Sequence, residues 1–145
     1  MELGSDYIIL NSGNNLKSVN VKTQGYPGFP TDLQQPLTTL LTQCIGISKL
    51  EETIYENRFQ NIPYLVEMGA NIEILGKKIK INGPTELAGK KVTATDLRAG
   101  ACLVLAGLIA NGETTILEIE HVLRGYENII EKLTNVGAKI QIEEI

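Results

Sequence analysis

Residues 94–110 of the chain read ATDLRAGACLVLAGLIA. Thr95 is a good N-cap residue, and Asp96 at the first helical position would face the positive end of the helix dipole. The helix expected over Leu97–Ala110 is apolar on nearly every side, and a helix without a polar face is buried all round. The pattern therefore favours an α/β fold in which helices gather inside and sheets lie outside them. It predicts burial for three side chains that point in different directions: Leu103, Leu105 and Ile109.

The chain contains this arrangement twice. Thr31-Asp32-Leu33 also precedes an apolar helix pattern, and each half continues with an arginine in a turn and a second helix ending at Gly-Ala. The offset between the halves is 64 residues at the aspartates, 66 at the arginines and 68 at the glycines. A slowly drifting offset with the features in one order is typical of a duplicated unit with small insertions. The matching positions are Asp32 and Asp96, Arg58 and Arg124, and Gly69 and Gly137.

The first half predicts one βαβαββ unit over residues 25–83. Pro36 would disrupt a helix interior, so the regular helix is expected to begin nearer Pro36 than Asp32. Gly69 fits the left-handed position that follows a helix. A buried helix stripe is expected at Leu33, Leu37, Leu40, Leu41, Cys44 and Ile45, followed by a strand over Leu50–Tyr55 and a turn at Asn57-Arg58-Phe59. A short helix is expected to bury Ile62, Leu65 and Val66, and a hairpin is expected from Ile72–Leu75 and Lys78–Asn82.

The second βαβαββ unit is expected over residues 84–145. After its long helix come a strand over Thr114–Ile119, a helix from Gly125 and a last strand over Lys139–Glu144. Residues 1–24 are expected to be the terminal hairpin of a preceding unit, in which residues 7–10 pair with residues 18–22 around a turn at residues 12–15. We therefore expect one domain, and a chain that begins inside a larger protein.

Composition narrows the function classes. The 145 residues are 43% hydrophobic and 21% charged, as in ordinary globular domains. The net charge of -4 gives no electrostatic case for nucleic acid or an anionic membrane as partner. Residues 99–110 are too short to span a bilayer, and Met1–Ser5 lacks the basic start of a signal peptide. Cys44 and Cys102 lie in apolar helix patterns, which indicates buried thiols in a reducing cytosol and hence a cytoplasmic protein.

The candidate chemistry rests on the repeated aspartates and arginines. His121 is the single histidine, there is no spaced Cys or His cluster for a metal, and no cofactor is expected. Helix N-termini together with Arg58, Arg98 and Arg124 would suit a phosphate or a carboxylate. The alternative is structural, since each Asp could cap a helix and pair with an Arg. At this level the two interpretations are balanced.

Several blocks of the chain resemble one enzyme family, in order and over essentially the whole length. The sequence is similar to the UDP-N-acetylglucosamine 1-carboxyvinyltransferase family of enolpyruvyl transferases, and to its C-terminal part only. The blocks are GYPGFPTDLQ (25–34), ETIYENRF (52–59), ATDLRA (94–99), LVLA (103–106) and RGYE (124–127). The resemblance implies an inside-out α/β barrel of repeated βαβαββ units, with buried helices and outer sheets.

The resemblance also implies substrate-binding roles. Asp32 matches the acid that hydrogen-bonds the sugar and is a candidate proton acceptor from its hydroxyl. Ile54 matches a backbone contact to the UDP-sugar, with Tyr55 beside it where the family often has Phe. Arg58 and Arg98 match two arginines of the cleft, and Asp96 matches a cleft acid. Arg124 matches an arginine that closes on the phosphate of phosphoenolpyruvate.

The expected activity is transfer of enolpyruvate from phosphoenolpyruvate to the 3-hydroxyl of UDP-N-acetylglucosamine, in peptidoglycan synthesis. Asp32 and Arg124 are the expected catalytic residues. The family's active-site cysteine loop and N-terminal lysine have no match here, so the isolated chain is expected to be inactive without the N-terminal portion of the protein. The alternatives are a segment of the related shikimate-pathway transferase, or a non-catalytic βαβαββ binding module. We expect Asp32, Arg58, Asp96 and Arg124 to lie at one end of the domain, at least partly exposed.

Overall fold

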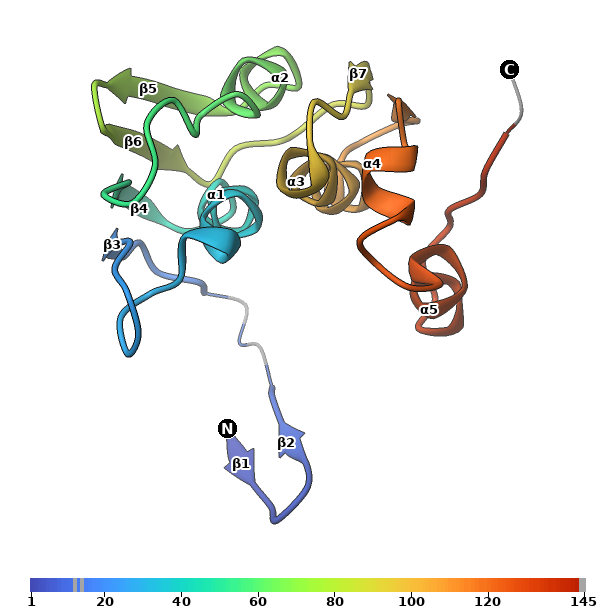
Figure 1. Ribbon diagram of the computed structural model, residues 1–145, viewed down its shortest axis with the longest axis horizontal. Coiled ribbons are helices and arrows are strands. Elements are labelled where there is room, and N and C mark those ends of the chain that lie inside the picture. The colour runs from blue at the N-terminus through green and yellow to red at the C-terminus, as the bar shows by residue number, and fades with distance from the viewer. Residues whose placement is uncertain (12, 14, 144–145) are drawn as a thin grey trace.

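The computed structural model describes residues 1–11, 13 and 15–143 of the chain (Figure 1). Its strands are β1 (Glu2–Leu3), β2 (Ile8–Ile9), β3 (Asn20–Lys22), β4 (Gly46–Glu51), β5 (Asn71–Leu75), β6 (Lys78–Gly83), β7 (Lys91–Thr93) and β8 (Thr115–Leu117). Its helices are the 3-10 turn η1 (Thr31–Leu33), α1 (Gln34–Leu41), α2 (Ile62–Glu67), α3 (Leu97–Ile109), α4 (Glu120–Leu123) and α5 (Ile129–Asn135).

A four-stranded sheet carries the first half of the chain. Its strand order is β3-β4-β6-β5, with β3 parallel to β4 and the other neighbours antiparallel. In chain order the elements β3, α1, β4, α2, β5 and β6 form one βαβαββ unit. The β5–β6 hairpin was predicted and is confirmed, with Gly76 at φ +63° in its turn. Gly69 follows α2 at φ +110°, where its lack of a Cβ allows the left-handed conformation.

The expected hairpin between residues 7–10 and residues 18–22 is wrong. β2 pairs with β1, and β3 instead pairs in parallel with β4, so that Val21 lies opposite Leu50. The pairing with β4 places Val21 against the hydrophobic core, whereas residues 1–11 are exposed throughout. The turn expected at residues 12–15 lies partly outside the described residues. The unit boundaries after residues 24 and 83 remain predictions, although β3 belongs to the sheet of the unit that we begin at residue 25.

The core lies between this sheet and three helices. Figure 1 shows α1 and α3 side by side, and the two helices pack against each other. The helices and the sheet both contribute fully buried side chains: Leu41, Leu65 and Leu103 from the helices, and Leu50, Ile79 and Ile81 from the sheet. The parallel pair β7–β8 and the short helix α4 cover another side of α3. The fold is therefore α/β, with α1 and α3 inside and the sheets outside them.

α1 does not bury the leucine stripe that the sequence predicts. Leu41 and Cys44 are buried, but Leu33, Leu40 and Ile45 are exposed. The buried face is mostly polar, and where it packs against α3 the Thr39 hydroxyl donates to the carbonyl of Cys102 at 3.1 Å. This face consists of Gln34, Gln35, Thr38, Thr39 and Leu41. The α-helix begins at Gln34, close to Pro36 as expected.

The prediction of all-round burial for α3 is correct only for its first part. Residues 99–104 are all buried, and Leu103 is 0% exposed, but Leu105 is 39% and Ile109 47% exposed. The described residues thus leave one side of the C-terminal half of α3 open. Asp96, not Thr95, is the N-cap, because its carboxylate accepts from the amides of Arg98 and Ala99 at 2.8 and 3.1 Å.

The end of the chain differs most from expectation. α4 is an additional helix, and α5 begins at Ile129 instead of Gly125. Residues 139–143 form no strand, and Glu144 of the expected last strand lies outside the described residues. In the described part of the second half, the elements are therefore β7, α3, β8, α4 and α5, without the two closing strands of a βαβαββ unit. Among the described helices, none combines the length and apolarity needed to cross a bilayer.

Candidate functional site

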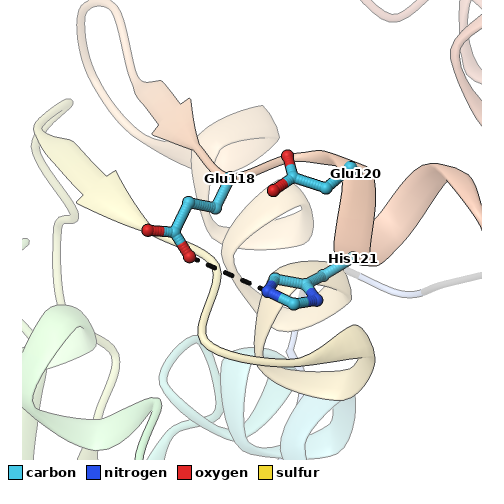
Figure 2. A group of neighbouring side chains, drawn as sticks. All are labelled: Glu118, Glu120 and His121. Carbon is cyan, nitrogen blue, oxygen red and sulfur yellow. Dashed lines mark ion pairs between the residues drawn. The ribbon is translucent and has the colours of Figure 1, made fainter.

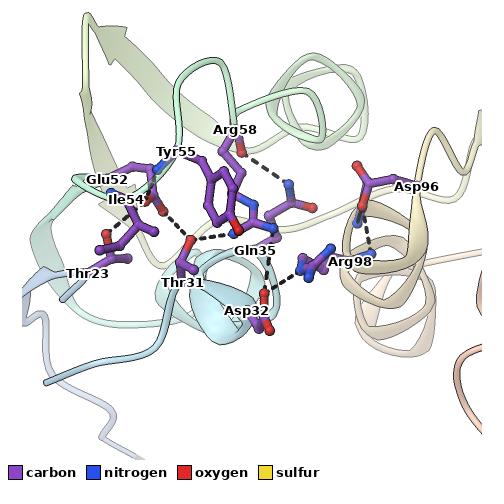
Figure 3. A network of polar contacts seen from close by, with 11 residues as sticks. Thr23, Thr31, Asp32, Gln35, Glu52, Ile54, Tyr55, Arg58, Asp96 and Arg98 are labelled. Carbon is purple, nitrogen blue, oxygen red and sulfur yellow. Dashed lines mark hydrogen bonds and ion pairs between the residues drawn. The ribbon is translucent and has the colours of Figure 1, made fainter. Parts of the chain in front are cut away.

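The starts of α1 and α3 meet at a charged cluster. The Asp32 carboxylate lies 2.6 Å from Nε of Arg98 and 3.5 Å from Nη2 of Arg58. Asp32 belongs to η1, directly ahead of α1, and Arg98 to the first turn of α3 (Figure 3). The structure therefore brings together three of the predicted site residues: Asp32, Arg58 and Arg98.

The two arginines set the charge state of Asp32. The hydrogen bond from Arg98 lowers the pKa of Asp32, against partial desolvation, and the positive charges of Arg98 and Arg58 lower it further. The same hydrogen bond raises the pKa of Arg98. Asp32 is therefore firmly ionised and a weak base as it stands. It would become a stronger base if an anionic ligand drew the arginines away.

Arg58 is held from several sides, and its side chain is only 12% exposed. Its guanidinium lies over the Tyr55 ring at 4.3 Å from the centroid, and Nη1 donates to the hydroxyl of Thr31. Its carbonyl accepts from Nε2 of Gln35 at 3.1 Å. These contacts orient the guanidinium toward Asp32, so that a planar donor group lies at the start of α1.

The structural alternative, in which each aspartate caps a helix and pairs with an arginine, is divided between the two: one aspartate caps a helix and the other pairs with arginines. Asp96 caps α3 through Oδ1, which anchors the helix start beside Arg98. Asp32 caps nothing and pairs with arginines instead, and its side chain is 64% exposed. The cleft role of Asp96 and the sugar-binding role of Asp32 remain predictions.

Arg124 lies near the same helix start but does not join the cluster. A Cβ on Gly125 would come within 2.3 Å of Leu97 Cδ1, so the backbone after Arg124 passes close to the first residue of α3. The side chain of Arg124 contacts His121, with Nη2 3.1 Å from Nδ1. Its closure on a phosphate remains a prediction, and in this structure one terminal nitrogen of the side chain is engaged by His121.

One group of side chains has the residue types and the spacing to hold a metal ion: Glu118, Glu120 and His121 (Figure 2). One ligand atom from each lies within 4.8 Å of the others. An arginine has only donors, so the contact with Arg124 makes Nδ1 of His121 the acceptor and leaves the proton on Nε2, which faces Glu118 at 3.7 Å. The lone pair of Nδ1 is taken up by Arg124 and Nε2 carries a proton, so neither ring nitrogen is available to a metal ion. With a guanidinium adjacent as well, the arrangement does not fit a metal site.

Sequence reasoning missed the role of Glu52 and of the two threonines that donate hydrogen bonds to it. The Glu52 side chain is almost fully buried and accepts hydrogen bonds from Thr23 and Thr31. Burial alone would raise the pKa of Glu52, but hydrogen bonds from the amides of Ile54 and Tyr55 and from the two hydroxyls lower it overall. The only available signal was its place in the ETIYENRF block, which does not indicate burial.

The surface of the described residues includes an open groove and a larger hollow. An open groove of about 450 Å³ runs between residues 52–60 and the β5–β6 turn, and Tyr55 and Arg58 form part of its wall. A larger one of about 560 Å³ lies between α3, β8 and residues 138–143, and its lining includes none of the predicted site residues. The smaller groove therefore adjoins the charged cluster, and we regard it as the more relevant of the two.

The two cysteines are buried free thiols, as predicted. Burial raises the pKa of Cys102 to about 11, and Thr39 and Asn61 hydrogen-bond to its sulfur. A thiol with so high a pKa carries almost no thiolate at neutral pH and is a poor nucleophile. Cys102 is therefore part of the packing between α1 and α3.

Comparisons with known proteins agree with this architecture. The chain is 56% identical over 99% of its length to UDP-N-acetylglucosamine 1-carboxyvinyltransferase 1 of Streptococcus agalactiae, and 53% identical over 97% to UDP-N-acetylglucosamine 1-carboxyvinyltransferase 2 of Listeria monocytogenes. It spans about a third of the length of these relatives, 34% and 33%.

Solved structures share the fold. The enolpyruvyl transferase NikO from Streptomyces tendae matches with a TM-score of 0.81 and 32% identity, over 88% of this chain and 30% of that one. EPSP synthase from Acinetobacter baumannii matches with a TM-score of 0.63 at 21% identity, over 88% and 28%, which shows the fold alone. The EPSP synthase (3-phosphoshikimate 1-carboxyvinyltransferase) family model matches residues 3–133. The chain therefore belongs to the EPSP synthase family of enolpyruvyl transferases.

Proposed function

We propose that the chain is the part of a UDP-N-acetylglucosamine 1-carboxyvinyltransferase that binds the sugar nucleotide and contributes to phosphate binding. The observation that carries the proposal is Asp32 held between Arg58 and Arg98 where two helices begin. Such a cluster offers a carboxylate to a hydroxyl group and guanidinium groups to an anion. The identity of 56% to the Streptococcus agalactiae relative favours the sugar nucleotide over 3-phosphoshikimate as acceptor.

The reaction assigns each group a task. The sugar 3-hydroxyl adds to the central carbon of phosphoenolpyruvate while the methylene carbon takes up a proton. Phosphate then leaves as that carbon loses a proton and the enol double bond re-forms. Asp32 would take the hydroxyl proton, and Arg124 would stabilise the phosphate. Because Arg58 and Arg98 weaken Asp32 as a base, anionic groups of bound substrate would activate it by engaging these arginines.

Ile54 and Tyr55 would contact the sugar nucleotide from the loop after β4. The Ile54 amide already donates to Glu52 at 2.8 Å, so the proposed backbone contact would use its carbonyl as an acceptor. Tyr55 is more than half exposed and already holds Arg58 on one ring face. An exposed ring beside a guanidinium suits stacking against a planar base or a sugar ring.

The remaining two thirds of the protein would complete the site. We propose that phosphoenolpyruvate, UDP-N-acetylglucosamine and the N-terminal portion are the partners, that nucleic acid and membranes are not, and that the reaction takes place in the cytoplasm. The isolated chain should release no phosphate from the two substrates. The non-catalytic alternative for this chain predicts that restoring the missing portion gives no activity either.

A chimaera tests the proposal. The chain would replace the matching third of the Streptococcus agalactiae relative, and phosphate release would be measured with UDP-N-acetylglucosamine or 3-phosphoshikimate as acceptor. We expect turnover with the sugar nucleotide only, and a loss of kcat in Asp32→Ala of roughly a hundredfold or more because the hydroxyl loses its base. Asp6→Ala, an exposed aspartate outside the cluster, is the matched control. A folded but inactive chimaera, or one that prefers 3-phosphoshikimate, would refute the assignment.

A further inference from the structure

Glu52 is an ionised side chain buried directly behind the candidate site. It follows β4, and only 1% of it is exposed. Oε1 accepts from the Thr23 hydroxyl at 2.9 Å and from the amides of Ile54 and Tyr55 at 2.8 and 3.1 Å. Oε2 accepts from the Thr31 hydroxyl at 2.8 Å. Four donors from two chain segments therefore converge on one carboxylate.

No lysine or arginine within the described residues forms an ion pair with Glu52. Burying a carboxylate without a cation is costly, so the four hydrogen bonds must offset that cost for the charge to persist. One link to a positive charge runs through Thr31, whose oxygen also accepts from Nη1 of Arg58. The buried anion and the arginine of the site thus share one hydroxyl group (Figure 3).

The direction of these hydrogen bonds follows from the charge. An ionised carboxylate only accepts, so the Thr31 hydroxyl must donate to Glu52, and its lone pairs are left for Arg58. The other end of the same guanidinium lies 3.5 Å from Asp32. Along this line the groups alternate as carboxylate, hydroxyl, guanidinium and carboxylate, from Glu52 to Asp32.

Glu52 also shapes the loop that carries Tyr55 and Arg58. Its two amide contacts tie residues 54 and 55 back to the end of β4, ahead of Asn57, which has φ +56°. Asparagine tolerates this conformation better than most non-glycine residues, and the amide contacts tie down the loop just ahead of it. The carboxylate supplies them from inside, while the outer side of the loop stays open to a ligand.

We propose that Glu52 is a positioning residue of the site, a buried anion that sets Arg58 through Thr31 and so, beside Arg98, helps to hold Asp32 in place. With only 1% of it exposed, Glu52 is closed off from a ligand and acts only through these neighbours. The proposal rests on the proposed function in one respect, since it takes Arg58 and Asp32 as the groups that meet the substrate. The geometry itself can be tested without any substrate.

The test uses NMR on the 145-residue chain. Glu52→Gln keeps the shape and removes the charge, and Glu51→Gln is the matched control because this neighbour pairs with Lys78 on the sheet surface. In Glu52→Gln we expect the Ile54 and Tyr55 amide signals and the Arg58 side-chain signal to move. The pKa of Asp32 should rise by several tenths of a pH unit as Arg58 loses its orientation. Glu51→Gln should change none of these signals.

Variants of Thr31 test the relay separately. Thr31→Val removes the shared hydroxyl and should move the Arg58 signal and the Asp32 pKa in the same direction as Glu52→Gln. Thr31→Ser restores a hydroxyl and should restore both. If Glu52→Gln does not fold, this pair still decides the matter. A merely structural glutamate would leave Arg58 and Asp32 unchanged in every folded variant, and that result would overturn the proposal.

The chimaera separates this inference from the proposed function. If it turns over, Glu52→Gln should lower kcat/KM for the sugar nucleotide at least tenfold, and Glu51→Gln should not change it. If the unmodified chimaera is inactive while the NMR shifts occur as expected, the proposed function fails and the positioning role stands. If the chimaera is active and the NMR signals of Arg58 and Asp32 do not respond, the positioning role fails alone.

Discussion

The Arg98 guanidinium lies 2.6 Å from the Asp32 carboxylate, although 66 residues separate them in the chain. This contact joins the start of α3 to the turn ahead of α1. It shows that Asp32 of the first half and Arg98 of the second lie at one end of the domain, where the helix starts of the two halves were expected to meet. It also means that the charge on Asp32 is linked to how the two halves pack, which gives the first prediction.

Asp32→Asn should make stability less sensitive to acid. The arginines hold the pKa of Asp32 below its value in the unfolded chain, so its ionised form stabilises the fold above the unfolded-state pKa, and this contribution is lost as the pH falls through the folded-state pKa. Urea unfolding at a series of pH values should show the largest difference between wild type and variant near neutrality, and none in strong acid. Asp6→Asn is the control. A difference that persists at the lowest pH would contradict this account.

Arg124→Ala in the chimaera should weaken the use of phosphoenolpyruvate. A charged hydrogen bond is worth roughly 1.5–3 kcal/mol, so kcat/KM for phosphoenolpyruvate should fall by roughly tenfold to a hundredfold. Steady-state kinetics with each substrate varied in turn measure the effect. His121→Ala removes the contact that Arg124 makes in this structure and keeps the guanidinium, so it should not reproduce the loss. An unchanged kcat/KM in Arg124→Ala would remove Arg124 from the site.

Asp96→Ala should destabilise the chain through the start of α3. Loss of an N-cap costs about 0.5–2 kcal/mol, and here two amide hydrogen bonds to the carboxylate disappear. Asp96→Ser keeps a capping oxygen and should restore most of the free energy of unfolding. Thr95→Ala should have a smaller effect, because Thr95 is not the cap. Denaturant unfolding of the three variants distinguishes the two positions, and a larger cost for Thr95→Ala would contradict the observed cap.

Leu103→Ala and Leu105→Ala should differ sharply although they lie two residues apart on α3. Leu103 is fully buried, and truncating a buried leucine costs about 2–5 kcal/mol. Leu105 is 39% exposed, so its truncation should cost much less. Thermal and urea unfolding of both variants check this. Equal costs would mean that α3 is buried on every side in solution, as its sequence pattern alone suggests.

The sequence by itself determined the features that depend on nearby residues. The β5–β6 hairpin, the left-handed Gly69 after α2 and the helix start near Pro36 were predicted correctly, because turn and helix-end preferences act within a few residues. The repeat also predicted that Asp32 and the start of α3 lie at one end. This prediction needs no individual contact, because equivalent positions of two similar units that pack side by side lie at the same end.

Only the tertiary structure decided which groups meet. Val21 pairs with Leu50 in parallel, the polar face of α1 is the buried one, and Glu52 is buried beneath the site. Each of these outcomes depends on partners 20 or more residues away, such as Thr31 for Glu52 at a separation of 21. An apolar or charged pattern shows what a side chain prefers. Packing decides whether a hydroxyl, an amide or another helix is there to satisfy it.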